Sequence, residues 1–231
     1  MWLVISDTHV GDRQANKNLP SLLALLEEFA DKDCTLVLNG DIFDFSKFLG
    51  FDERHRAFLL AVQKFKKIIY IEGNHDWFVS GIRDVFPHIS FRKEMLLRIN
   101  NEIIRISHGH QTDSTVMRHP RFNRILTAFN KWIYELIGVD LQHAFRKTWL
   151  VQRFLLQRQE NKLVRMESQA NVIIAGHTHR PCIRKIYDTT YCNTGDWVDP
   201  SHRAYAIIHD DGRVELVKLR GKKWIGTKLG S

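Results

Sequence analysis

The sequence predicts an α/β fold built on parallel strands. Five short apolar runs have the length and the β-branched content of buried strands. They lie at residues 2–5, 35–38, 68–71, 103–106 and 172–175. Between the first three runs, apolar residues recur at helical spacing over 19–29 and 53–65. Strand, helix and strand in this order form crossover units, which favour parallel strands.

The rest of the chain adds hairpins to this pattern and gives no sign of a second domain. Two pairs of strand-like runs each flank a short polar turn, as in hairpins. The pairs are 183–187 with 191–193, and 204–209 with 214–219. The 231 residues suffice for one core and contain no Pro- or Gly-rich linker. We therefore expect one domain over 1–231 that ends in a loosely held tail at 221–231.

Composition and charge narrow the classes of function. The apolar runs are shorter than the ~20 residues that cross a bilayer, and residues 1–6 lack the basic start and the cleavage site of a signal peptide. We therefore expect a cytoplasmic protein, with any contact at the inner face of the membrane being peripheral. The three cysteines show no CxxC spacing, which argues against a disulfide framework. A net charge of +8 favours anionic partners such as phosphates, nucleic acid or acidic lipid headgroups.

A long helical segment at 116–168 carries most of the excess positive charge. It holds ten Lys or Arg residues against four acidic ones, and its large apolar residues recur at helical spacing. One interpretation is a pair of helices that pack on the sheet with a solvated basic face. The other is a cap that binds a substrate with an acyl chain at a membrane surface. In that case Phe129 and Trp132 would contact the chain, and the basic residues would reach anionic headgroups.

Each of the five predicted strands is followed at once by a polar cluster that can bind metal ions. The clusters are Asp7 with His9, Asp41 with Asp44, Asn74 with His75 and Asp76, His108 with His110, and His177 with His179. In sheets of parallel strands, ligands bind beyond the carboxyl ends of the strands, where these clusters would meet. Carboxylate, imidazole and amide ligands without thiolates suit Mn, Fe, Zn, Co or Mg. Two divalent cations would offset the buried carboxylates, so we expect a dinuclear site.

In order along the chain, these clusters match D-x-H, G-D-x-x-D, G-N-H-D, H and G-H-x-H blocks. With them, the chain resembles the calcineurin-like metallophosphoesterase family. The resemblance implies a four-layer α/β/β/α sandwich with a helical insert, and an enzyme that hydrolyses phosphoric esters or pyrophosphates with two divalent metal ions, Mn²⁺ foremost. By this resemblance, one metal would be held by Asp7, His9, Asp41 and His179. The other would be held by Asp41, Asn74, His108 and His177, so that Asp41 would bridge the two ions.

The same resemblance implies a mechanism for the hydrolysis. Two metal ions would bind phosphate oxygens, and a hydroxide that bridges them would attack the phosphorus atom. His75 would stabilise the pentavalent phosphorus or protonate the leaving oxygen. Either Asp76 or Asp44 would orient the imidazole of His75.

A narrower resemblance is to the bacterial UDP-2,3-diacylglucosamine pyrophosphatases of lipid A synthesis. It rests on the helical insert and on the runs 176–181 and 193–198, and it implies a phosphorylated, lipid-linked substrate. The residues that would bind this substrate are Phe129, Trp132, Arg180, Asp196 and Trp197. This chain has His75 and His110 where those enzymes usually carry an arginine and an aspartate.

Two other functions stay open at this point. A phosphodiesterase or nuclease of the same family would use the basic insert to follow the backbone of nucleotides or nucleic acid. A binding scaffold would keep the fold and lose the metal site. Every expected metal ligand is present in this sequence, which favours an enzyme over a scaffold.

Overall fold

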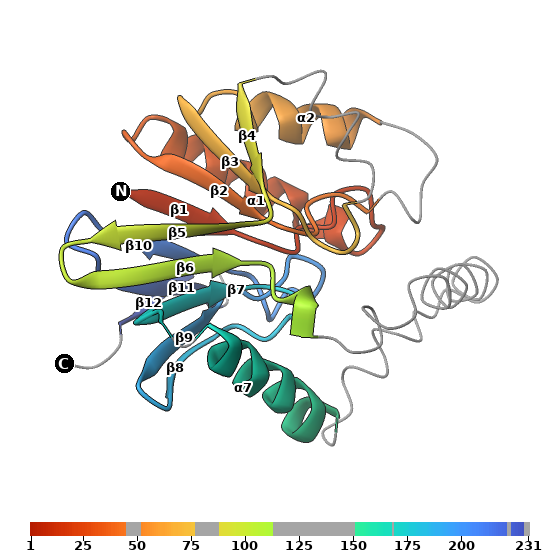
Figure 1. The fold of residues 1–231 in the computed structure, drawn as a ribbon. Coiled ribbons are helices and arrows are strands. Elements are labelled where there is room, and N and C mark those ends of the chain that lie inside the picture. Colours follow the sequence, from red (N-terminus) through yellow and green to blue (C-terminus); the bar gives the residue numbers. More distant parts are fainter. Residues whose placement is uncertain (45–51, 77–87, 113–150, 168, 221–222, 229–231) are drawn as a thin grey trace.

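Two β-sheets lie at the centre of the protein, and helices cover their outer faces (Figure 1). The computed structural model describes residues 1–44, 52–76, 88–112, 151–167, 169–220 and 223–228. The strands are β1 (Trp2–Ile5), β2 (Thr35–Asn39), β3 (Lys67–Ile71), β4 (Ile89–Arg92), β5 (Glu94–Ile99), β6 (Glu102–Ser107), β7 (Val172–Ala175), β8 (Cys182–Ile186), β9 (Thr189–Asn193), β10 (Ala204–Ile208), β11 (Val214–Arg220) and β12 (Lys223–Lys228). The α-helices are α1 (Ala15–Ala30), α2 (Glu53–Val62) and α7 (Gln157–Met166).

Each sheet contains a run of parallel strands. The first sheet has the strand order β12-β11-β10-β1-β2-β3-β4, and its strands β1 to β4 are parallel. The second sheet has the order β5-β6-β7-β9-β8, and β6, β7 and β9 are parallel. Parallel neighbours end at the same edge of a sheet, so the loops that follow them lie close together.

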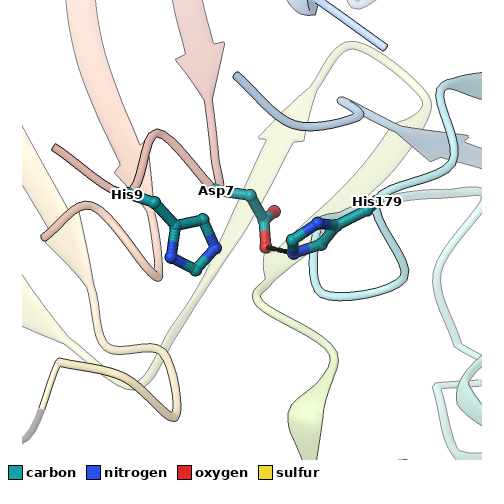
Figure 2. A group of neighbouring side chains, drawn as sticks. All are labelled: Asp7, His9 and His179. Carbon is teal, nitrogen blue, oxygen red and sulfur yellow. Dashed lines mark ion pairs between the residues drawn. The ribbon is translucent and has the colours of Figure 1, made fainter. Parts of the chain in front are cut away.

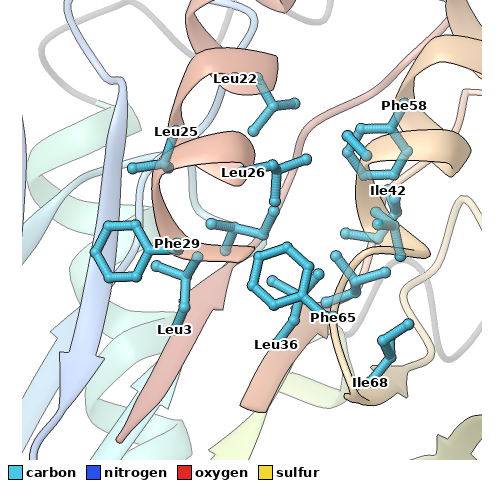
Figure 3. Close-up of a cluster of buried hydrophobic side chains, with 14 of the residues drawn as sticks. Leu3, Leu22, Leu25, Leu26, Phe29, Leu36, Ile42, Phe58, Phe65 and Ile68 are labelled. Atoms are coloured by element: carbon cyan, nitrogen blue, oxygen red, sulfur yellow. The ribbon is translucent and has the colours of Figure 1, made fainter. Parts of the chain in front are cut away.

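Helices α1 and α2 cover the outer face of the first sheet. Leu22 and Leu26 of α1 and Phe58 of α2 are buried in one cluster with Leu3 and Leu36 of the sheet (Figure 3). Residues four apart lie on the same side of a helix, which is why the apolar spacing predicted an amphipathic helix here.

The facing surfaces of the two sheets enclose a second apolar cluster, because successive strand residues point to opposite faces. Val4 and Val37 point away from the helices and are buried in a cluster with Ile104 and Ile174 of the second sheet. On its outer face, the second sheet packs against α7 in a third cluster. The order of layers is therefore helix, sheet, sheet and helix, which confirms the predicted α/β/β/α sandwich.

The strands predicted from the five apolar runs are all present, and so are both predicted hairpins. β1 and β7 have the predicted bounds, whereas α2 ends at Val62, earlier than predicted. Of the predicted helical insert at 116–168, the described part is 151–167, where a π-helical turn at Val151–Leu156 leads into α7. Phe129 and Trp132 lie outside the described residues. Among the helices that the structure describes, none is long and apolar enough to cross a membrane.

The prediction of a loosely held tail at 221–231 is wrong for the residues of β12. This strand pairs antiparallel with β11 along its whole length. Its Trp224 lies against the core, with ring centroids 5.1 Å from Tyr205 and 6.0 Å from Trp197. β4 and β5 were also missed by the sequence analysis. β12 was not predicted because polar and glycine residues surround Trp224 in the sequence. In the structure, tertiary packing of this one aromatic side chain stabilises the strand.

Candidate metal centre

The polar loops that follow β1, β2, β3, β6 and β7 meet at one edge of the two sheets. The backbone N–H of Asp7 donates to the carbonyl of Gly40 at 3.0 Å, which joins the loops after β1 and β2. The N–H of Gly176 donates to the carbonyl of His108 at 3.0 Å and joins the loops after β7 and β6. The five clusters that the sequence analysis singled out therefore meet through the order of the parallel strands within each sheet and the packing of the two sheets on each other.

Five residues of these loops adopt left-handed backbone conformations that side chains other than glycine rarely accept. They are Asp7 (φ 49°), His9 (φ 43°), Asp41 (φ 52°), His177 (φ 64°) and His179 (φ 58°). Such a conformation costs on the order of 1–3 kcal/mol per residue and persists where the surrounding structure enforces it. All five residues are among the predicted metal ligands, so the backbone strain is concentrated where the side chains converge.

Asp7, His9 and His179 form the first group of converging side chains (Figure 2). Their ligand atoms all lie within 4.8 Å of one another, and Asp7 Oδ1 is 3.0 Å from His179 Nε2. The carboxylate of Asp7 also accepts the backbone N–H of His177 at 3.0 Å. Burial raises the pKa of Asp7, but the positive charges of His179 and His108 outweigh this effect and lower the pKa to about 2. Asp7 is therefore a fully ionised carboxylate in a buried position.

Asp41, His108 and His177 form the second group, whose ligand atoms also lie within 4.8 Å of one another. His108 Nε2 is 3.1 Å from Asp41 Oδ2, and His108 Nδ1 lies 2.9 Å from the carbonyl oxygen of Asn39. When the ring is neutral, donation from Nδ1 to this carbonyl places the free lone pair on Nε2. The ring is thus oriented with its ligating nitrogen toward Asp41.

Asp41 interacts electrostatically with both groups. Burial raises its pKa, but His108, His75 and His9 outweigh burial and hold the pKa well below the usual range. His9 belongs to the first group and His108 to the second. A carboxylate that interacts with both sets of ligands is suited to bridge two cations.

The carboxylates in turn raise the pKa values of two histidines, His9 and His108. Burial lowers the pKa of His9, but Asp44 and then Asp41 more than compensate and raise it to about 9. Burial likewise lowers the pKa of His108, and Asp41 is the main cause of its net rise to about 10. Without bound metal, the centre therefore favours positive charge strongly enough to keep protons on buried imidazoles.

The donor atoms of the centre fit divalent metal ions. Within the part of the chain that the structure describes, His9 Nε2 and Asn74 Oδ1 are buried and have no hydrogen-bond partner. Buried polar atoms are nearly always paired, so unpaired atoms on two predicted ligands are consistent with a missing ligand at each. The set combines carboxylate, imidazole and amide donors without thiolate, as the sequence analysis predicted.

The two acids proposed to orient His75 make different contacts in the structure. Asp44 Oδ1 lies 3.9 Å from His75 Nδ1, and Asp44 Oδ2 lies 3.7 Å from His9 Nδ1. Asp76 instead accepts backbone N–H groups, those of Asp41 at 2.7 Å and Gly73 at 2.8 Å. Asp44 is therefore the acid that faces the imidazole of His75, and Asp76 joins the loops that carry the predicted ligands.

Two glycines are required for these close approaches. A Cβ atom on Gly73 would lie 2.2 Å from Asp41 Oδ1. A Cβ atom on Gly40 would lie 2.4 Å from His108 Nδ1, and Gly40 also has a φ of +80°. Any side chain at either position would displace a predicted ligand of the metals.

The residues predicted to bind substrate lie in different environments. Arg180 is exposed and directly follows His179. Asp196 and Trp197 are 0% and 1% exposed, so in this structure neither presents its side chain to a substrate. Their assignment to substrate binding stays a prediction.

Some supporting residues were missed by the sequence analysis. The side-chain amide of Asn193 donates to the carbonyl of Gly176 at 2.7 Å, and Asn39 orients His108 through its carbonyl group. Asn193 belongs to the run 193–198, which was a usable signal. Asn39 acts through its backbone, so its residue type carried no signal.

A family model described as "Calcineurin-like phosphoesterase" matches residues 2–181, which include all five polar clusters. The chain belongs to the calcineurin-like phosphoesterase family. With its converging aspartates and histidines, this phosphoesterase is a metal-dependent phosphoester hydrolase.

Curated relatives of this phosphoesterase carry a more specific name. The UDP-2,3-diacylglucosamine hydrolase of Haemophilus influenzae is 26% identical over 220 residues, which cover 84% of this chain and 89% of the relative. The UDP-2,3-diacylglucosamine hydrolase of Shewanella loihica is 24% identical and covers 82% and 88% of the two chains.

Solved structures share the fold of this phosphoesterase. A Vps29 single mutant from Entamoeba histolytica aligns with a TM-score of 0.55 at 13% identity, over 99% of each chain. The phosphoesterase Yfce from E. coli aligns with a TM-score of 0.51 at 15% identity, also over 99% of each chain. At these identities the likeness is one of fold.

Proposed function

We propose that this phosphoesterase binds two divalent metal ions and uses them to hydrolyse a phosphate ester or pyrophosphate bond. The proposed ligands are Asp7, His9, Asp41, Asn74, His108, His177 and His179. Among the residues that the structure describes, three groups of candidate ligand atoms each lie within 4.8 Å, and the third consists of His9, Asp44 and His75. The observation that carries the proposal is that the first and second groups consist of predicted ligands, with Asp41 electrostatically linked to both. Mn²⁺ is the proposed metal, with Fe, Zn, Co and Mg as alternatives that suit the same donors.

The bound ions would supply Lewis acidity toward the phosphate oxygens and a nucleophile at neutral pH. The protein residues supply orientation and proton transfer. His75 is partly exposed at the rim, with its Nδ1 facing Asp44. This leaves its Nε2 to donate a proton to the leaving oxygen, while the carboxylate of Asp44 faces the opposite nitrogen of the ring.

For the substrate, we propose a sugar-nucleotide pyrophosphate with acyl chains, of the UDP-2,3-diacylglucosamine type. The names of the two curated relatives support this proposal. Arg180, exposed beside His179, is suited to bind a phosphate oxygen. The predicted contacts of the acyl chain, Phe129 and Trp132, lie outside the described residues, as does most of the segment proposed to touch the membrane surface.

The test is a metal-supplemented screen of the purified protein against phosphomonoesters, phosphodiesters and UDP-2,3-diacylglucosamine, with products identified by mass spectrometry. The expected products from the last substrate are UMP and the acylated sugar phosphate. Absence of turnover on every substrate with every metal would overturn the phosphoesterase proposal. If diesters or nucleic acid are cleaved and the acylated substrate is untouched, only the choice of substrate is wrong.

The bridging position of Asp41 has its own test. Asp41→Ala should reduce the metal content from two ions per chain to well below one, because the loss of a shared carboxylate leaves the repulsion between the cations uncompensated. Plasma mass spectrometry of the desalted protein measures the content. Retention of both ions would show that Asp41 does not bridge them.

A further inference from the structure

A buried carboxylate, that of Asp196, lies behind the imidazole of His179 in the first group. His179 Nε2 faces Asp7 Oδ1 at 3.0 Å (Figure 2), and His179 Nδ1 on the other side of the ring lies 3.6 Å from Asp196 Oδ2. Asp196 is 0% exposed. The two ring nitrogens of one proposed metal ligand thus each face a different carboxylate.

We propose that Asp196 is a positioning residue that fixes the orientation and the proton position of His179. The inference rests on the proposed function, because it takes His179 as a ligand of the first metal. An imidazole that ligates through Nε2 must carry its remaining proton on Nδ1, and an acceptor at Nδ1 stabilises this tautomer and makes the ligand more basic. Asp196 Oδ2 is the carboxylate oxygen that faces Nδ1, at an ion-pair distance of 3.6 Å that is longer than a hydrogen bond.

Asp196 is itself held in place relative to the metal site. Its Oδ1 accepts the backbone N–H groups of Val198 at 2.8 Å and Asp199 at 2.7 Å. The next residue, Trp197, donates its backbone N–H to the carbonyl of Asp7 at 3.0 Å. Oδ1 therefore stabilises the turn at 196–199, and Oδ2 faces the imidazole of His179.

A second imidazole shares that other oxygen. His202 Nδ1 lies 2.8 Å from Asp196 Oδ2. His202 is outside the two groups of converging ligands. A substitution of His202 can therefore distinguish two possible roles of Asp196. One role is to orient a metal ligand through His179, and the other is to anchor the 199–203 loop through His202.

The burial of Asp196 argues against the role in substrate binding that the sequence analysis gave it. A side chain with no exposed surface acts on a substrate through another residue, and His179 lies between Asp196 and Asp7. The expected effect of a substitution is consequently on metal affinity first, with any change in turnover following from it.

The decisive variant is Asp196→Asn, compared with His202→Ala as the matched control. Asparagine can keep the turn through its side-chain oxygen, but it then presents an N–H₂ donor to His179 Nδ1 and favours the tautomer that cannot ligate through Nε2. Zinc titration by calorimetry should show an affinity about 10- to 100-fold weaker at one of the two sites. The site of Asp41, His108 and His177 should keep its zinc, which shows that the variant is folded. His202→Ala should bind zinc at both sites as wild type does.

Nitrogen NMR of histidine-labelled, zinc-loaded wild type adds a measurement that does not depend on the variant being folded. We expect a protected proton on His179 Nδ1. Finding zinc on Nδ1, or equal zinc affinity in wild type and Asp196→Asn, overturns the positioning role. An equal loss of affinity in His202→Ala also overturns it. Failure of the wild type to bind zinc, manganese or any other of the proposed metals overturns the proposed function as well, so the two failures are distinguishable.

Discussion

Asp76 Oδ2 accepts the backbone N–H of Asp41 at 2.7 Å, and so joins the loop after β3 to the loop after β2. The same carboxylate accepts the N–H groups of Ile42 at 3.1 Å and Gly73 at 2.8 Å. Three backbone donors from two loops thus share one buried side chain, and the spacing between the loops depends on both of its oxygens.

Asp76→Asn should destabilise the metal-free protein, because the amide has one acceptor oxygen and its N–H₂ group would face a backbone donor. Leaving a buried donor unpaired costs about 1–3 kcal/mol, which urea denaturation in the presence of chelator measures. Asp211→Asn is the matched control, since Asp211 accepts the N–H of Arg213 at 3.0 Å on an exposed turn. Equal stability of the two variants would contradict the role given to Asp76.

His75→Ala should keep both metals and lose turnover by roughly 10²-fold, the contribution expected of a general acid. Protonation matters less for a good leaving group, so the loss should be smaller on an activated aryl ester than on an alkyl ester. Steady-state kinetics on the two esters, together with metal analysis, measure both effects. A rate equal to that of wild type on the alkyl ester would remove His75 from the mechanism.

Gly73→Ala should lower metal affinity and activity together, because the added Cβ would lie 2.2 Å from Asp41 Oδ1. Gly226→Ala in β12 provides the control. Its Cβ would come even closer to Glu215 Oε1, at 2.0 Å, but that atom is the end of a flexible side chain that can move away. If metal binding responds equally to both substitutions, the close approach of Gly73 has no special consequence for the centre.

Metal binding should become stronger as the pH rises. The pKa values of about 9 for His9 and about 10 for His108 lie above the ordinary value of 6.5. Their charged forms therefore stabilise the metal-free fold below pH 6.5, and this contribution is lost as the pH rises through 9 to 10. A metal must displace these protons. The rise in melting temperature on adding metal should thus be larger near pH 8.5 than near pH 6.5, and a rise that does not depend on pH would refute the linkage.

The sequence predicted the position of the centre because the polar clusters directly follow apolar strands, and parallel strands bring such loops together. It could not distinguish Asp44 from Asp76 as the partner of His75, since the choice depends on which carboxylate the folded loops turn toward the ring. It also could not reveal that Asp196 is buried, because an aspartate after Gly195 is compatible with an exposed turn as well. β12 was missed for a related reason: Trp224 acquires its role only when Tyr205 and Trp197 lie beside it.

The proposed ligands come from both sheets, with Asp7 and Asp41 following strands of the first and His108 and His179 following strands of the second. An ion held by both sets is a cross-link between the sheets. By mass action, each tenfold rise in free metal above the dissociation constant adds about 1.4 kcal/mol to the cost of separating them. Metal supply would then govern how often the apolar interface between the sheets opens to water, and amide hydrogen exchange in β1 and β7 would slow as the metal concentration increases.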